Sequence, residues 1–158
     1  MQKIHPCLWF DQNAEEAVNF YVSVFKNSKI KAVTRYGDTG PLPKGTALTI
    51  AFELEGQEFM ALNGGPAFKF NEAISLSVGC ATQEELDALW QKLLAGGGQE
   101  QQCGWLKDKY GLSWQIVPAA LTEMMQDRDA EKVNRVMTAV LQMVKLDIAR
   151  LKQAYSGA

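Results

Sequence analysis

One succession of patterns occurs twice within the first 118 residues of this chain. An apolar stretch at 4–10 is followed by apolar residues at helical spacing over 14–25 and by three strand-like segments. The same succession begins again with 73–79 and a helical stripe over 86–94. Periods of about 2 and 3.6 residues distinguish the strands from the helices. The order β-α-β-β-β, met twice, indicates an internal duplication and an α+β fold, with chance recurrence as the alternative because residue identity between the halves is weak.

Local signals support the individual elements. The remaining strand patterns are 29–36, 46–55 and 58–63 in the first half, and 99–102, 104–107 and 112–117 in the second. Asn13 and Thr82 each precede a Glu by three residues, which is the spacing of a helix capping box. Glu55-Gly56 predicts a tight hairpin. Tyr110-Gly111 predicts a second turn, which Asp108 is placed to cap.

The last forty residues have a different pattern. Apolar residues recur at helical spacing from Val133 to Tyr155, which predicts one long amphipathic helix from Asp129 to about Ala154. A shorter helix is expected over 119–125. The predicted organisation is therefore a domain at 1–118 and a C-terminal helical extension at 119–158. The domain consists of two modules, at about 1–66 and 70–118.

Composition excludes several classes of function. The net charge is -2 and no cluster of Lys or Arg is present, so we expect no binding to nucleic acid or to an anionic membrane surface. No run approaches the roughly 18 apolar residues of a membrane-spanning helix, and the N-terminus has no signal-peptide pattern. Cys7, Cys80 and Cys103 match no zinc motif. Buried thiols in a reducing cytoplasm are the simplest reading, with a reactive Cys103 as the alternative.

Short motifs spread over the chain carry a family resemblance. They are Trp9-Phe10, 14–17, Phe20-Tyr21, 59–65, Ser75, 83–87 with Trp90, 103–118 and 143–147. Together they resemble the PhnB-like branch of the vicinal oxygen chelate superfamily, often labelled 3-demethylubiquinone-9 3-methyltransferase. The superfamily includes glyoxalase I, extradiol dioxygenases and bleomycin-resistance proteins. The resemblance implies a half-open, glyoxalase-like barrel around a cavity, and a homodimer.

The resemblance also implies where a metal would lie. Metal-dependent members place His and Glu ligands on the first and fourth strands of each module. His5 matches the first position, and the others fall near Ala61, Ala73 and Gln115, with Glu72 as the alternative to Ala73. One imidazole, one amide and two methyl groups do not make a site for a hard divalent ion. We therefore expect no conventional metal site and no cofactor.

Alternation along the strands predicts which side chains line the cavity. If His5 faces inward, the inward side chains are Cys7, Trp9, Phe59, Ala61, Asn63, Ser75, Ser77, Ser113, Gln115 and Val117. Among these residues and the predicted strand 104–107, we predict that the ligand contacts are Trp9, Phe59, Asn63, Ser75, Trp105 and Gln115. Aromatic walls with a few polar groups suit a small organic ligand. A place in the core is the alternative for Trp105, as for Trp114. A structural bridge between strands is the alternative for Gln115, and a hydrogen bond to a neighbour at the strand end is the alternative for His5.

Three classes of function follow. The first is binding of an unidentified small organic molecule without a conventional metal site. The alternative is an enzyme of the glyoxalase or dioxygenase type, either metal-dependent or using His5, the only histidine, as the catalytic base. A structural or regulatory dimer without a ligand is the third possibility. Methyl transfer from S-adenosylmethionine is not expected, because no glycine-rich turn opens a helix after the first strand.

Overall fold

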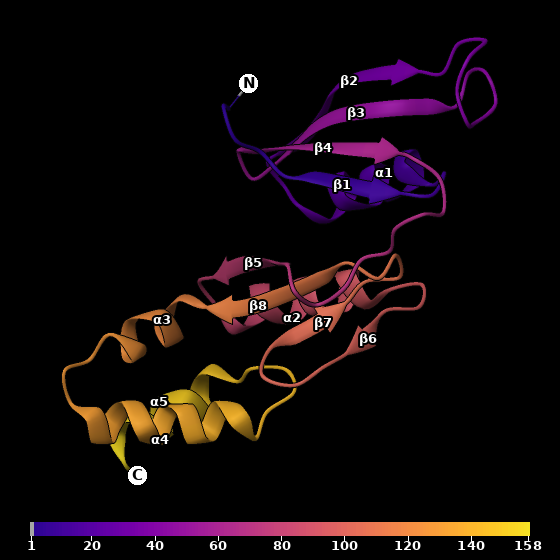
Figure 1. Cartoon of the computed structure of the whole chain (residues 1–158). Coiled ribbons are helices and arrows are strands. Elements are labelled where there is room, and N and C mark those ends of the chain that lie inside the picture. The colour runs from indigo at the N-terminus through magenta and orange to yellow at the C-terminus, as the bar shows by residue number, and fades with distance from the viewer. Residues whose placement is uncertain (1) are drawn as a thin grey trace. The chain divides into compact units, whose positions relative to one another are not determined.

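The computed structural model describes residues 2–158, which form two compact units divided between Phe70 and Asn71. Each unit contains a four-stranded mixed sheet with a helix packed on one face (Figure 1). Within the described residues neither sheet closes into a barrel. The fold is α+β, as predicted.

The first unit follows the predicted element order. Its elements are β1 (Cys7–Phe10), α1 (Ala14–Val24), β2 (Ser28–Arg35), β3 (Ala47–Leu54) and β4 (Gln57–Asn63). The strand order is β1-β4-β3-β2, with β1 and β4 parallel and the other neighbours antiparallel. The hairpin between β3 and β4 turns at Glu55-Gly56, where φ is 46° and 83°. Positive φ at both positions matches the twist of a two-residue hairpin, so the predicted turn is confirmed.

Helix α1 covers one face of the first sheet. Its buried residues recur at helical spacing: Ala14, Ala17, Val18, Tyr21 and Val24. On the sheet, Ile50 and Phe52 are fully buried. This apolar layer is the core of the first unit.

The N-terminus of α1 is capped differently from the prediction. Asn13 makes no side-chain capping bond. Instead, Oδ1 of Asn63, at the end of β4, accepts the Ala14 N–H at 2.9 Å. The cap therefore comes from a residue distant in sequence, and the prediction for Asn13 was wrong.

The second unit has the same order and pairing. Its sheet elements and helix are β5 (Ser75–Cys80), α2 (Gln83–Leu94), β6 (Gln99–Glu100), β7 (Trp105–Lys107) and β8 (Ser113–Pro118). The strand order is β5-β8-β7-β6, and β5 and β8 are parallel. Thr82 Oγ1 accepts the Glu85 N–H at 3.2 Å, and Glu85 accepts the Ala81 N–H at 2.8 Å. The predicted cap of α2 is confirmed.

The C-terminal extension contains three helices rather than two. They are α3 (Ala119–Met125), α4 (Ala130–Leu141) and α5 (Ile148–Ser156). The predicted long helix is therefore wrong: the chain leaves the helix after Leu141, and Asp147 caps a new one by accepting the Arg150 N–H at 2.9 Å. Helices α4 and α5 lie side by side (Figure 1). None of the helices within residues 2–158 combines the length and apolarity needed to span a membrane.

Candidate functional site

Each sheet has one face covered by its helix and one opposite face, which we call the open face. On the second sheet, strand register assigns two rows of side chains to this face. The first row is Ser75, Ser113 and Lys107, and the second is Ser77, Gln115 and Trp105. Ser77 is exposed, whereas Gln115 and Trp105 are half-buried. Trp114 and Ile116 point to the α2 side and are buried. The predicted alternation along β8 is confirmed, and Trp114 belongs to the core.

Two serines on this open face differ in their hydrogen bonding. Gln115 Nε2 donates to Ser75 Oγ at 2.9 Å. The neighbouring Ser113 is fully buried, and its Oγ has no hydrogen-bond partner within the described residues. A buried hydroxyl without a partner costs about 1–3 kcal/mol in desolvation. Ser28 Oγ is also unpartnered, but it pairs in register with Leu54 on the helix side of the first sheet.

Lys107 is the charged member of the open face. Its Nζ forms an ion pair with Glu72, and the two side chains are 26% and 50% exposed. The hydrogen bond from Lys107 is the main reason that the pKa of Glu72 lies below its ordinary value. The two charges therefore cancel beside Ser113.

The turn before β8 fixes the start of this strand. Asp108 Oδ1 accepts the N–H groups of Tyr110 and Leu112 at 2.8 and 3.1 Å, and Gly111 has a φ of 87°. Asp108 Oδ2 accepts the indole N–H of Trp114 at 2.9 Å. The predicted role of Asp108 as the turn cap is confirmed, and the same carboxylate anchors the core tryptophan of β8.

The C-terminal extension supports the open face from one end of β7. The N–H groups of Cys103 and Gly104 donate to the carbonyls of Met143 and Val144 at 2.8 and 2.7 Å. The Gly104 carbonyl in turn accepts the Ile116 N–H at 2.8 Å. These bonds hold the backbone immediately before Trp105 against the segment that separates α4 from α5.

The open face of the first sheet is different in character. Register assigns to it Cys7, Trp9, Thr49, Ala51, Met60 and Leu62, together with the charged Glu53 and Glu58 next to the β3–β4 hairpin. The indole N–H of Trp9 donates to the Gly65 carbonyl at 2.9 Å, and its ring makes an edge contact with Phe68 at 5.0 Å between centroids. A Cβ on Gly64 would lie 2.3 Å from the Trp9 ring. The ring is thus held firmly by its own unit.

Phe59, Ala61 and Asn63 do not share this face. Ala61 pairs in register with Leu8, and Phe59 pairs with Phe52, so both lie on the α1 side. The rings of Phe59 and Phe52 are stacked at 5.3 Å, and Asn63 donates to the Ala47 carbonyl at 2.9 Å in addition to capping α1. The prediction that these three residues face the same way as Trp9 was wrong.

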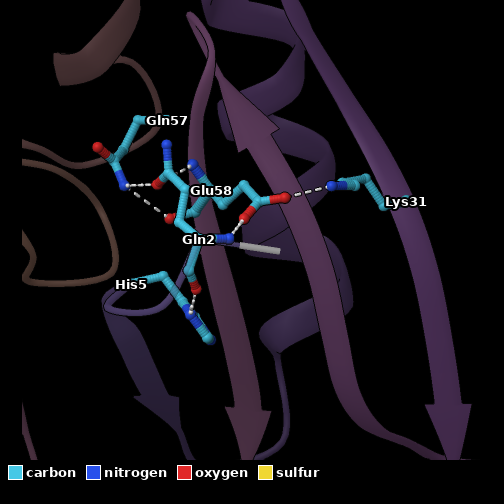
Figure 2. Close-up of polar contacts among 5 residues, drawn as sticks. All are labelled: Gln2, His5, Lys31, Gln57 and Glu58. Atoms are coloured by element: carbon cyan, nitrogen blue, oxygen red, sulfur yellow. Dashed lines mark hydrogen bonds and ion pairs between the residues drawn. The ribbon is translucent and has the colours of Figure 1, made fainter.

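His5 lies just before β1, which begins at Cys7 rather than at Ile4. His5 Nδ1 is 3.2 Å from the Gln2 carbonyl oxygen. Because a carbonyl oxygen only accepts, Nδ1 is the donor in this contact. Figure 2 shows the surrounding polar cluster, in which Gln2 also accepts a bond from Gln57 at 2.8 Å.

Glu58 is the centre of that cluster and was not singled out by the sequence. Its carboxylate accepts bonds from the Lys31 ammonium and from the Gln2 backbone N–H (Figure 2). The bond from Lys31, then that from Gln2, lowers the pKa of Glu58 from 4.5 to about 2. The cluster ties the N-terminal segment to β4 and β2.

The donor set does not fit a conventional divalent-metal site. Among the described residues, no three His, Cys, Asp or Glu side chains are placed to share a metal ion. Of the positions matched to ligands, Ala61 faces α1 and Ala73 precedes β5. Gln115 presents a neutral amide already bonded to Ser75. This chemistry lacks the charged ligands that a hard cation requires.

Comparison with known proteins identifies the family. A family model described as 3-demethylubiquinone-9 3-methyltransferase matches residues 2–117. The chain belongs to this family. A PhnB protein from Bacillus cereus is 42% identical, with a TM-score of 0.69, over 75% of this chain and 100% of that chain. The match to the PhnB-like family confirms the resemblance found in the sequence.

More distant structures share the fold. Protein PA1353 from Pseudomonas aeruginosa has a TM-score of 0.61 at 21% identity, over 75% of this chain and 98% of that chain. The fosfomycin resistance protein FosX from Listeria monocytogenes, solved with Mn(II) and sulfate, has a TM-score of 0.56 at 14% identity, over 80% of this chain and 98% of that chain. The fold is therefore glyoxalase-like, as in the vicinal oxygen chelate superfamily. A search of curated proteins finds no match.

The family description mentions methyl transfer, which would need a methyl donor. The glycine-rich segments of this chain already donate their backbone N–H groups to carbonyls within the fold. The N–H groups of Gly64 and Gly65 donate to the carbonyls of Phe10 and Asp11, and that of Gly98 donates to Leu94. These segments therefore do not fit a cofactor-binding turn that opens a helix.

Proposed function

We propose that this PhnB-like protein binds a small organic molecule on the open face of the second sheet. The observation that carries the proposal is the buried, unpartnered Oγ of Ser113. It lies in register between Ser75 and Lys107 and on the same face as Gln115 and Trp105. A native fold retains such an unsatisfied group where a ligand or an ordered water completes its hydrogen bonding. Half-buried Trp105 supplies the apolar surface beside it.

The residues assigned to ligand contact are Ser75, Trp105, Ser113 and Gln115. Trp9 is excluded from this set because its indole is held within the first unit. Phe59 and Asn63 are excluded because they pack on the α1 side.

The test is a titration of the ¹⁵N-labelled full chain with small ring compounds, followed by NMR. The indole signal of Trp105 and the amide signals of Ser113 and Gln115 should shift saturably. The indole signal of Trp9 serves as the internal control and should not move. Saturable shifts confined to the first sheet, or none at all, would overturn the proposal.

We also propose that the protein is a homodimer in the cytoplasm. Strands β1, β2, β5 and β6 are sheet edges, and unpaired edges favour association. Ile30 and Val33 on β2 are 36% and 37% exposed. All three cysteines are free, which suits a reducing compartment. Analytical ultracentrifugation should give twice the mass of one chain, and a monomer at micromolar concentration would contradict the proposal.

A further inference from the structure

The open face of the second sheet carries no net charge, and this restricts what it can bind. Lys107 is the only charged side chain that register assigns to the face. Its ammonium is already paired with the Glu72 carboxylate. An anionic ligand would meet both members of the pair, and the attraction of one would be offset by the repulsion of the other. The face therefore favours a neutral ligand.

The hydrogen-bonding groups on the face define a complementary pattern. Gln115 Nε2 is directed to Ser75 Oγ, so the carbonyl oxygen of the same amide is left as an acceptor. The unpartnered Ser113 hydroxyl is left as a donor. The bond to Ser75 draws the Gln115 amide toward the row that contains Ser113. A ligand that satisfies both groups must present an acceptor and a donor side by side.

Trp105 sets the shape of the ligand. It pairs in register with Gln115 and is half-buried. Its indole N–H has no partner within residues 2–158, unlike that of Trp9. The flat surface of an indole beside an amide suits a planar ring that stacks on it.

Resting on the proposed function, we propose that this face selects a neutral aromatic ring that bears a primary carboxamide. The ligand carbonyl accepts from Ser113 Oγ–H, and its NH₂ group donates to the Gln115 carbonyl. The ring lies against Trp105. Lys107 pairs in register with Ser113, and its ion pair with Glu72 is half-exposed and therefore weak, so the Lys107 side chain moves aside as the carboxamide reaches Ser113.

Benzamide and benzoate provide a matched pair of probes, because they have the same shape and differ in charge. In calorimetric titrations of the full chain, benzamide should bind about tenfold more tightly than benzoate, as expected for one favourable hydrogen bond and an unfavourable charge. Glu72→Gln leaves the Lys107 charge unpaired, so benzoate should gain about tenfold while benzamide changes less than about twofold. Glu84→Gln, an exposed change on α2, is the control and should alter neither affinity.

Ser113→Ala tests the hydroxyl directly. Benzamide should lose about tenfold in affinity, whereas Ser77→Ala, on the same face but exposed, should change it less than twofold. Tighter binding of benzoate than of benzamide by the wild-type protein would overturn the ligand class and leave the site intact. Equal affinity of Ser113→Ala and wild type for benzamide would overturn the assigned contact. If no ring compound shifts the Trp105 indole signal, the proposed function itself fails.

Discussion

The two sheets have the same strand order but use their open faces differently. In the first unit the charged residues of the face, Glu53 and Glu58, lie next to the β3–β4 hairpin, and its largest side chain, Trp9, is held by Gly64, Gly65 and Phe68. In the second unit the face carries three serines, two glutamines and a lysine. Its buried Ser113 hydroxyl has no hydrogen-bond partner among residues 2–158.

The two units differ in whether their buried polar side chains already have hydrogen-bond partners or are left to bond a ligand. Asn63 and Glu58 in the first unit are buried and fully engaged with neighbours. Ser113 in the second unit is equally buried but unengaged. Shared topology therefore does not imply a shared role, and the second face is the better candidate for binding.

The largest expected effect concerns the extension, which belongs to the second unit. Leu146 is 1% exposed, and a Cβ on Gly104 would contact its side chain at 2.9 Å. Leu146→Ala should lower the free energy of unfolding by about 2–5 kcal/mol through the cavity that it leaves. Leu141→Ala, at a position 63% exposed, should change it by less than about 0.5 kcal/mol. Urea unfolding measures both variants, and equally small losses of unfolding free energy would show that the extension is not anchored at Leu146.

The next effect concerns Asn63, whose side-chain amide makes two hydrogen bonds in the first unit. Asn63→Ala removes the cap of α1 and leaves the Ala47 carbonyl without its partner, so stability should fall by about 2–3 kcal/mol. Asn13→Ala is the matched control, because the Asn13 side chain makes no capping bond. Urea unfolding followed by circular dichroism measures both. A larger loss of stability for Asn13→Ala than for Asn63→Ala would show that Asn13 caps α1, as the sequence predicted.

A pair of glycine variants compares the open faces directly. Gly64→Ala should cost about 1–3 kcal/mol, since its Cβ would overlap the Trp9 ring. Gly79→Ala, on the open face of the second sheet, should be within about 0.5 kcal/mol of wild type, because nothing lies within 4 Å of its Cβ. Thermal unfolding distinguishes the two outcomes. Equal stability of both variants would mean that Trp9 is not held in place by Gly64.

The smallest effect depends on pH. Because the pKa of Glu58 is lowered from 4.5 to about 2 in the folded protein, its ionised form stabilises the fold. That contribution is complete above about pH 4.5 and is lost as the pH falls toward 2. Wild type should therefore be more stable than Glu58→Gln at pH 6, and the difference should shrink toward zero by pH 2. A difference independent of pH would contradict the assigned bond to Lys31.

Local signals in the sequence were sufficient for some elements. Residues 119–125 form the predicted short helix, and the cap of α2 and the turn at Asp108 depend on residues within a few positions of one another. The cap by Asn63 could not be predicted in this way, because it bridges 49 residues. The end of α4 could not be predicted either, since an apolar stripe continues past Leu141, and the segment after it is held by bonds to residues distant in sequence, Cys103, Gly104 and Gln83.

The candidate site was predictable where polar and apolar residues alternate clearly. Along β8 the polar Ser113 and Gln115 alternate with Trp114 and Ile116, so the face was assigned correctly. Along β4 both alternating sets are largely apolar, and a shift of one residue exchanges the faces. This explains the error for Phe59. The pairing of Lys107 with Glu72 depends on the tertiary fold and had no sequence signal.

The most direct test of the difference between the two open faces is the stability of Ser113→Ala in urea. If the hydroxyl is kept for a ligand, removing it relieves the cost of an unpartnered buried group. The free energy of unfolding should then rise by about 1 kcal/mol, in contrast to the loss expected for Asn63→Ala. A fall of about 1 kcal/mol or more would show that Ser113 is a structural residue, and would contradict the account of the second face.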